Sequence, residues 1–275
     1  MDQALIQRFV EDGFVKLEQV VPHDVADACA QLLWNETDAS PHHPSTWTRP
    51  VVWVGGMCQE PFVQAANVPA LHDAFDALIG PGRWAPRNSI GAFPLRFPHP
   101  DEPDDAGWHI EGSYEHPGAA DYWTNVHSRG RVLLMLFLFT EVDQDDAPTR
   151  IRVGSHIDVP PVLLPYGERG ASGRRLGPLV DAASAHRPVA LATGHPGDVY
   201  LCHPFLVHAA QPHHGRRPRF MGQPGLPPPP SHDSRPFDLT VVDVEPSPIA
   251  CTIRTALRIR PPGAAMSRPG GEAPG

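Results

Sequence analysis

The stretch from Trp108 to Tyr114 contains a histidine and a carboxylate two residues apart, at His109 and Glu111. On a β-strand, side chains at positions i and i+2 point to the same face, so these two groups can bind the same metal ion. An imidazole and a carboxylate on one face supply two of the three protein ligands of a facial triad, which is typical of mononuclear non-haem iron(II) sites. Alone, this spacing is a weak indication, because a strand histidine near a carboxylate is more often a surface pair.

A second segment offers two candidates for the third ligand, His203 and His208, and Arg219 follows His208 by eleven residues. A histidine on one strand and an arginine on the next, joined by a turn, would place a guanidinium near the metal. We favour His208 because only this histidine has that spacing. A facial triad leaves positions open for a bidentate keto acid and O₂, and arginine can bind the distal carboxylate of the keto acid with two hydrogen bonds.

These motifs, in this order, resemble the phytanoyl-CoA dioxygenase family of iron(II)/2-oxoglutarate oxygenases over most of the chain. The segments that carry the resemblance are 9–15, 108–111, 152–156 and 197–219. The resemblance implies a jelly-roll fold, iron ligation by His109, Glu111 and His208, and Arg219 as the anchor of 2-oxoglutarate. It also implies O₂ as the second cosubstrate and an activity as a dioxygenase.

The chain departs from the family pattern at two positions. The family more often has aspartate at the position of Glu111, and the usual proline of its "PGSH" turn is Val153 here. Related halogenases have a small residue in place of the carboxylate, which frees a metal position for chloride. The presence of Glu111 therefore favours hydroxylation or another oxidation.

Other residues are weaker candidates. Arg96 precedes His109 along the chain and is a candidate for binding 2-oxoglutarate or an acidic substrate, although a surface arginine would fit the same pattern. Trp108, Tyr114 and Trp123 flank the ligand segment and are candidates for the walls of a substrate pocket, although such aromatic residues are often core. We expect His156 to be a structural turn residue.

The elements that must position these residues change in type along the chain. Helical spacing predicts helices over 4–10, from residue 22 onward and over 69–79, and residues 14–17 read as a strand. From residue 89 short strands alternate with Pro, Gly and Asp turns, which favours a mainly β, cupin-like double-stranded β-helix (jelly roll) with supporting N-terminal helices. The eight expected strands are 89–97, 107–114, 132–142, 149–154, 187–193, 197–203, 205–210 and 216–223.

We expect a single domain over residues 1–260 and a disordered tail over 261–275, which is rich in Pro, Gly and Ala. Between the fourth and fifth strands, residues 158–186 form a longer segment rich in Pro, Gly and Arg. A loop of this length is either a lid over the substrate, with hinges at glycines 167, 170, 173 and 177, or a surface excursion.

Composition limits the function classes. The 275 residues are 41% hydrophobic and carry a net charge of −9, which argues against a nucleic-acid partner. The longest apolar run, 132–139, is too short to span a membrane, and residues 1–4 do not resemble a signal peptide, so we expect a cytoplasmic protein. The sequence carries no signal for an oligomeric state.

Lys16 is the only lysine, and the abundance of Arg, Pro, Ala and Gly suggests a GC-rich coding sequence. The sequence also contains no extended basic patch that would suit a CoA moiety. From these two observations we expect a small-molecule substrate, with specialised (natural-product) metabolism as the suggested context. Two alternatives remain open: a cupin-type metalloenzyme that does not use 2-oxoglutarate, and a catalytically silent jelly-roll binding protein.

Overall fold

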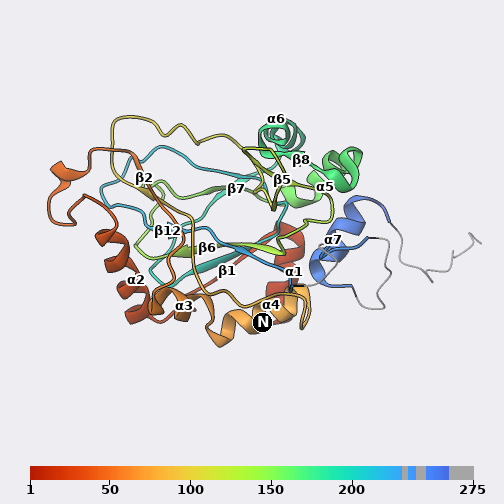
Figure 1. Cartoon of the computed structure of the whole chain (residues 1–275), viewed down its shortest axis with the longest axis horizontal. Helices are drawn as coiled ribbons and strands as arrows, with labels where there is room; N and C mark the ends of the chain where they lie inside the picture. Colours follow the sequence, from red (N-terminus) through yellow and green to blue (C-terminus); the bar gives the residue numbers. More distant parts are fainter. Residues whose placement is uncertain (231–234, 240–245, 260–275) are drawn as a thin grey trace, which may run out of the picture.

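The structure is a computed structural model, and it describes residues 1–230, 235–239 and 246–259. The tail expected to be disordered, residues 261–275, lies outside these described residues. Within them every strand pair is antiparallel, and helices flank the strands on both sides (Figure 1).

The N-terminal part of the chain forms the helices predicted from its sequence, which are α1 (Gln3–Asp12), α2 (His23–Asn35) and α4 (Pro69–Ile79). Asp2 caps α1 by accepting a hydrogen bond from the backbone N–H of Leu5 at 2.8 Å. Gly13 ends α1 in the left-handed conformation (φ 82°), and a Cβ there would lie 2.4 Å from Nδ1 of His156. Two shorter helices lie between α2 and α4, η1 (Pro44–Thr46) and α3 (Glu60–Ala66).

The main sheet has the strand order β1–β10–β6–β12, and β13 pairs with the other end of β6. Its strands are β1 (Phe14–Leu17), β10 (Val199–Cys202), β6 (Leu133–Leu138), β12 (Met221–Gly222) and β13 (Gly225–Leu226). β6 is the central strand, and all six of its residues are buried. β1 confirms the strand predicted directly after the first helix.

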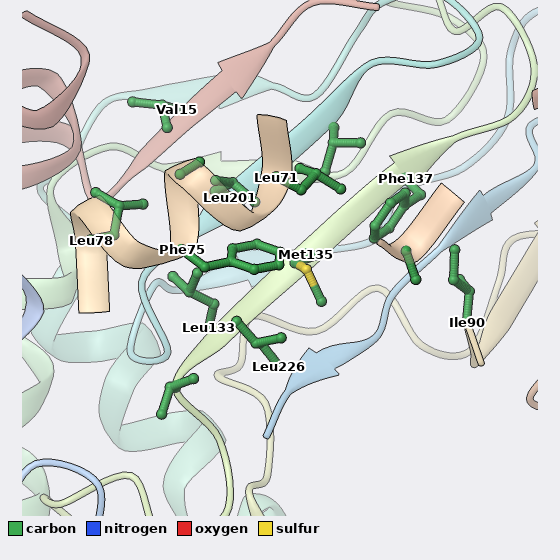
Figure 2. Close-up of a cluster of buried hydrophobic side chains, with 14 of the residues drawn as sticks. Val15, Leu71, Phe75, Leu78, Ile90, Leu133, Met135, Phe137, Leu201 and Leu226 are labelled. Atoms are coloured by element: carbon green, nitrogen blue, oxygen red, sulfur yellow. The ribbon is translucent and has the colours of Figure 1, made fainter. Parts of the chain in front are cut away.

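Alternate residues of β6 belong to two different hydrophobic clusters, as the period of a strand requires. Leu133, Met135 and Phe137 pack in the larger cluster with side chains of α4, including Phe75 (Figure 2). The intervening leucines, Leu134 among them, pack in a second cluster on the opposite face of the sheet, which also contains residues of β7 and β10. The main sheet is therefore covered on both faces, which explains why β6 reads as a continuous apolar run.

Three smaller sheets complete the fold. β11 (His208–Ala209), β7 (Arg150–Arg152) and β9 (Val189–Leu191) form one of them, on the side of β6 opposite to α2, α3 and α4 (Figure 1). β2 (Val51–Val54) pairs with β3 (Phe93–Arg96). The third consists of β4 (Tyr114–Glu115), β5 (Tyr122–Thr124) and β8 (Ala171–Ser172).

Each of the eight segments predicted as strands contains strand residues, but most observed strands are shorter. The largest difference is at 107–114, where only His109 forms an isolated bridge and only Tyr114 belongs to a strand. Helices contain more of the described residues than strands do. The antiparallel sheets thus agree with the prediction, whereas the expected predominance of β structure needs correction.

The expectation of a long loop over 158–186 is wrong. This segment folds into α5 (Val159–Leu163), η3 (Leu164–Arg169), β8 and α6 (Gly173–Ser184). The segment packs against the rest of the protein, because apolar side chains of α5 and α6, such as Leu163 and Leu176, are fully buried in the larger cluster. Two of the proposed hinge glycines, at 173 and 177, lie within α6, whereas those at 167 and 170 have positive φ values.

The described chain ends with α7 (Pro248–Ala256), whose buried face packs against α1 and α4. Ser247 caps this helix by accepting a hydrogen bond from the backbone N–H of Ala250 at 3.3 Å. Among the described residues, no helix has the length and the apolar composition needed to cross a membrane.

Candidate metal centre

His109 and His208 lie directly opposite each other on neighbouring backbone segments. Each donates its backbone N–H to the carbonyl oxygen of the other, and both N–O distances are 3.0 Å. Directly opposed residues of an antiparallel pair project their side chains to the same face. The two imidazole rings therefore lie together, with their centroids 4.5 Å apart.

The backbone also fixes which nitrogen of each ring carries the proton. Nδ1 of His109 lies 2.8 Å from the carbonyl oxygen of Gly107, and Nδ1 of His208 lies 3.0 Å from that of Leu206. Because a carbonyl only accepts, both Nδ1 atoms must be donors, and in the neutral ring this leaves the Nε2 lone pair free. Metal-binding histidines are typically held in this way by a partner outside the metal site.

Glu111 supplies the carboxylate beside these two nitrogens. Its Oε1 atom lies 3.6 Å from Nε2 of His208. One potential ligand atom from each of Glu111, His109 and His208 lies within 4.8 Å of the others. The next residue, Gly112, approaches Tyr122 so closely that a Cβ there would lie 2.3 Å from the Cβ of Tyr122. Glycine at 112 thus lets the chain after Glu111 pack against β5.

Glu111 is held as a carboxylate at any working pH. Burial alone would raise its pKa, but the neighbouring His208 and the positive charge of Arg131 lower the pKa to about 2. Burial and the neighbouring His208 lower the pKa of His109. Neutral imidazole and ionised carboxylate are the protonation states in which these groups bind a metal ion.

The triad faces a cavity of about 230 Å³. The cavity is lined by Trp53, Arg96, Asp105, His109, Glu111, Thr149, His208, Ala210 and Gln223. Most of these residues carry a polar or charged group, so the cavity can bind a small polar ligand.

Arg219 is fully buried and lies next to this cavity without lining it. Its backbone pairs with that of Arg96, and its Nη1 donates to the carbonyl of Ala147 at 2.9 Å and to Oγ1 of Thr149 at 3.4 Å. Its Nε atom is enclosed and has no hydrogen-bond partner. Burial, together with the positive charge of Arg96, lowers the pKa of Arg219 well below its usual range.

Arg96 lines the cavity and is only 3% exposed. Its Nη2 forms an ion pair with Oδ2 of Asp105 at 2.6 Å, while its Nε is enclosed without a partner. Within the described residues, Asp105 is the one carboxylate that pairs with either Arg96 or Arg219. Two buried cations thus share one counterion, and a bound anion would offset the remaining charge.

The three aromatic residues expected in the substrate pocket are elsewhere, and none of them lines the cavity. Trp108 lies against the guanidinium groups of Arg150 and Arg152, with Cζ atoms 4.8 and 4.2 Å from its ring centroid. Tyr114 and Trp123 are paired in the sheet of β4 and β5.

His203 is not part of the triad. It is fully buried, its Nδ1 accepts a hydrogen bond from the backbone N–H of Phe205 at 3.0 Å, and its Nε2 lies 3.1 Å from Oγ1 of Thr252. His156 is equally buried beside it, with the two ring centroids 4.9 Å apart. The structure thus brings His208, and not His203, to His109 and Glu111.

Reasoning from the sequence missed several residues of this region, among them Trp53, Asp105 and Arg131. Trp53 and Asp105 line the cavity, and the charge of Arg131 lowers the pKa of Glu111. Asp105 lies in an acidic stretch of the chain, residues 101–105. A local signal for it would have been its position four residues before His109, but no local signal indicates Trp53 or Arg131.

Solved structures share this fold at low sequence identity. The α-ketoglutarate-dependent epimerase SnoN of nogalamycin biosynthesis is 16% identical, with a TM-score of 0.52 over 89% of this chain and 91% of SnoN. HygX from Streptomyces hygroscopicus, crystallised with nickel and 2-oxoglutarate, is 17% identical, with a TM-score of 0.53 over 83% of this chain and 88% of HygX. GIG2 from Candida albicans is 14% identical, with a TM-score of 0.55 over 83% of this chain and 64% of GIG2.

At these identities the likeness shows a common fold. No protein-family model matches the chain, and no curated protein matches its sequence.

The donor set fits iron(II). Two imidazole nitrogens and one carboxylate on one side of a cavity form the 2-His-1-carboxylate arrangement of non-haem iron(II) oxygenases. The fully buried Arg219 and the ion-paired Arg96 next to this cavity add positive charge where an anionic cosubstrate would bind.

Proposed function

We propose that the chain is an iron(II)/2-oxoglutarate-dependent dioxygenase that hydroxylates or otherwise oxidises a small organic molecule, on a jelly-roll fold. The observation that carries this proposal is the triad of His109, Glu111 and His208 at a polar cavity beside two buried guanidinium groups. The membership in the phytanoyl-CoA dioxygenase family stays a prediction from the sequence motifs.

In this proposal His109, Glu111 and His208 hold the iron, and Arg219 and Arg96 provide the positive charge for the distal carboxylate of 2-oxoglutarate. When bound, the iron supplies the oxidising chemistry: O₂ and 2-oxoglutarate yield succinate and CO₂, and the second oxygen atom is inserted into a C–H bond of the substrate. The Nδ1–H donors of the two histidines hold both rings in the ligating tautomer. Glu111 offsets part of the metal charge without taking up a proton.

The structural neighbours support a small-molecule substrate. One structure of HygX contains hygromycin B together with nickel and 2-oxoglutarate, and one of SnoN contains a nogalamycin compound. Because these proteins act in or bind products of specialised metabolism, we propose the same metabolic context for this chain, as the sequence suggested.

The test of this function is direct binding of the metal and the keto acid. Under anaerobic conditions, iron(II) and 2-oxoglutarate together should give a weak visible charge-transfer band that neither component gives alone, as bidentate chelation at an open facial site requires. Admission of O₂ should then release succinate. Iron binding without a 2-oxoglutarate band would indicate the cupin-type alternative, and no metal binding would indicate a silent binding protein.

For residues 158–186 we propose that any closure over the substrate is limited to 164–170. The apolar side chains of α5 and α6 are buried, and Arg152 forms an ion pair with Asp181 of α6 at 2.5 Å, so these helices are anchored. η3 has no fully buried residue and contains a kink at Gly167. Hydrogen exchange with and without substrate should therefore change over 164–170 and not over α6, and equal protection throughout would contradict a lid.

A further inference from the structure

Trp53 is an exposed aromatic residue at the candidate metal centre. It lies on β2 and lines the same cavity as His109, Glu111 and His208. Its side chain is 60% exposed, which is the highest value among the large exposed hydrophobic residues of the described chain. A lone exposed hydrophobic residue needs no explanation on a flat surface, but this one borders the cavity in which the reaction would occur.

The size of the cavity limits what it can hold. Pockets that enclose drug-sized ligands measure roughly 300–1,000 Å³, whereas this cavity measures about 230 Å³. It therefore has room for a small keto acid beside the triad, but not for a whole substrate in addition. A substrate must present its reacting carbon to the cavity while most of its body lies at the mouth, where the exposed face of Trp53 is available.

The other lining residues offer no large hydrophobic side chain. Apart from Trp53 and the small Ala210, the lining is polar or charged. Arg96 and Asp105 are committed to each other in an ion pair, and Thr149 contacts the guanidinium of Arg219. Trp53 is thus the one large apolar surface that a substrate would meet at this cavity among the described residues.

The position of Trp53 is fixed by the sheet. Residues 51–54 pair in register with 93–96, which places Trp53 opposite Pro94 and Val51 opposite Arg96. The indole is therefore carried by the same two-stranded sheet as one of the two guanidinium groups. A site residue on a paired strand is held more precisely than one on a loop.

We propose that Trp53 is the platform on which a flat ring of the substrate stacks at the mouth of the cavity, the ring being either aromatic or the apolar face of a sugar. This inference rests on the proposed function and specifies its substrate as a ring compound larger than the cavity. Indole favours such partners because its broad face is apolar and electron-rich, so ring faces and C–H groups pack on it with defined geometry. An open chain would gain contact area but would not be oriented in this way.

The test uses protein loaded with nickel(II) and 2-oxoglutarate, so that binding is measured without turnover. The probes are small aromatic alcohols and methyl glycosides, each paired with an open-chain compound that has the same functional groups, and binding is followed by ligand-observed NMR. The two ring classes form separate arms, which distinguish an aromatic from a sugar ring. In the wild-type protein, one ring class should bind at least tenfold more tightly than its open-chain partners.

Trp53→Ala should weaken binding of that ring class by about tenfold, the size expected for loss of one stacking contact with its buried area. Trp53→Phe should retain most of the affinity. The matched control is Val189→Ala, because Val189 is an apolar residue of similar exposure (52%) on β9 that does not line the cavity. Compounds that bind through Trp53 should also be those that increase succinate release by the iron-loaded protein.

Equal binding of ring and open-chain probes by the wild type, or equal ring binding by Trp53→Ala, would overturn the inference. The proposed function is checked separately by titration of 2-oxoglutarate into the nickel-loaded wild type and Trp53→Ala proteins. Normal 2-oxoglutarate binding in both, without a ring preference, removes only the role of Trp53. No 2-oxoglutarate binding by the wild type removes the proposed function itself.

Discussion

Two pairs of histidines in this molecule have similar geometry and opposite chemistry. The ring centroids of His109 and His208, the candidate metal ligands (the ligand pair), are 4.5 Å apart. Those of His156 and His203 (the core pair) are 4.9 Å apart. The first pair has a carboxylate beside it and faces a cavity. The second pair lies in the protein interior and lines no described cavity, and burial lowers the pKa of both rings.

The two pairs differ in which ring nitrogens form hydrogen bonds with the rest of the protein. Nδ1 of His109 and of His208 donates to a backbone carbonyl, so Nε2 is left for a metal ion. In His203 the pattern is reversed: Nδ1 accepts from the backbone, and Nε2 donates to Thr252, whose hydroxyl itself donates to the carbonyl of Ile249. A histidine is available as a metal ligand here because its surroundings leave one lone pair free, and not because another histidine is near.

The difference between the two pairs is tested most strongly by removing one ring from each pair. His208→Ala should abolish iron binding and turnover while leaving the fold intact, because a triad with two ligands cannot hold the metal tightly. The same result is expected for His109→Ala and Glu111→Ala. Metal content and thermal unfolding of the purified variants are the measurements.

The control for that experiment is His203→Ala, which should retain the metal but lose stability. Deleting a fully buried ring leaves a cavity, and for large core side chains this costs about 2–5 kcal/mol. Full activity in His208→Ala with loss of metal in His203→Ala would show that the distal ligand had been assigned to the wrong histidine.

A similar contrast is expected between two arginines near the site: Arg219, the proposed anchor of 2-oxoglutarate, and Arg217, which we expect to affect stability alone. Arg219→Ala should weaken 2-oxoglutarate binding by roughly two to three orders of magnitude, since an unpaired buried carboxylate costs about 3–5 kcal/mol. Arg219→Lys should recover only part of this, because a point charge cannot reproduce the planar fork of arginine. Calorimetric titration of the metal-loaded variants measures both effects.

Arg217 is the matched control, because its guanidinium is half-exposed and forms ion pairs with Asp143 and Asp146. Arg217→Ala should reduce stability, since Asp146 would lose its partner, but should leave 2-oxoglutarate binding unchanged. A large loss of 2-oxoglutarate binding in Arg217→Ala, with none in Arg219→Ala, would show that the anchor is two residues earlier.

The sequence was sufficient to predict the residues that the structure brings together at the candidate metal centre. His109 and Glu111 are two residues apart, and the spacing of Arg219 from His208 distinguished that histidine from His203. The N-terminal helices were equally predictable, because their apolar spacing and their proline and glycine boundaries are local features. The regular strand expected around His109 is absent, but its bridge to His208 directs the ring to the same face.

What could not be predicted depends on contacts between distant segments. Trp53, Asp105 and Arg131 reach the site from three separate parts of the chain. Over 158–186 the abundance of proline and glycine favoured a loop. The apolar spacing of Leu176 and Val180, which lie on the buried face of α6, indicates a helix. Prolines 160 and 161 lie in the first turn of α5, where a missing backbone N–H costs little.

The pH dependence of the free energy of unfolding should reveal the lowered pKa values of His156 and His203, the core pair. Burial lowers the pKa of His156 from 6.5 to about 4, so between these values the unfolded chain takes up a proton that the folded chain does not. The free energy of unfolding should therefore fall as the pH falls from 6.5 to 4, by about 3 kcal/mol for this residue. His203 should act in the same direction, because burial and His156 also lower its pKa.

Urea denaturation of the metal-free protein at several pH values measures this slope. In His156→Phe the slope between pH 6.5 and 4 should decrease by about one proton. His42→Gln should leave it unchanged, because His42 is exposed. An unaltered slope in His156→Phe would mean that His156 titrates normally in the folded protein, and the contrast between the two pairs would lose its electrostatic basis.

The smallest expected effect comes from Thr252, whose hydroxyl forms a hydrogen bond with His203 of the core pair. Thr252→Val keeps the shape of the side chain but removes the oxygen that accepts from Nε2 of His203. A buried N–H without a partner costs about 1–3 kcal/mol, and the lost hydrogen bond from Oγ1 to the carbonyl of Ile249 falls within the same range. Stability should decrease by this amount, while metal content and 2-oxoglutarate affinity stay at wild-type values. Loss of metal in Thr252→Val would show that the two histidine pairs are coupled, and that the ligand pair depends on the core pair for its position.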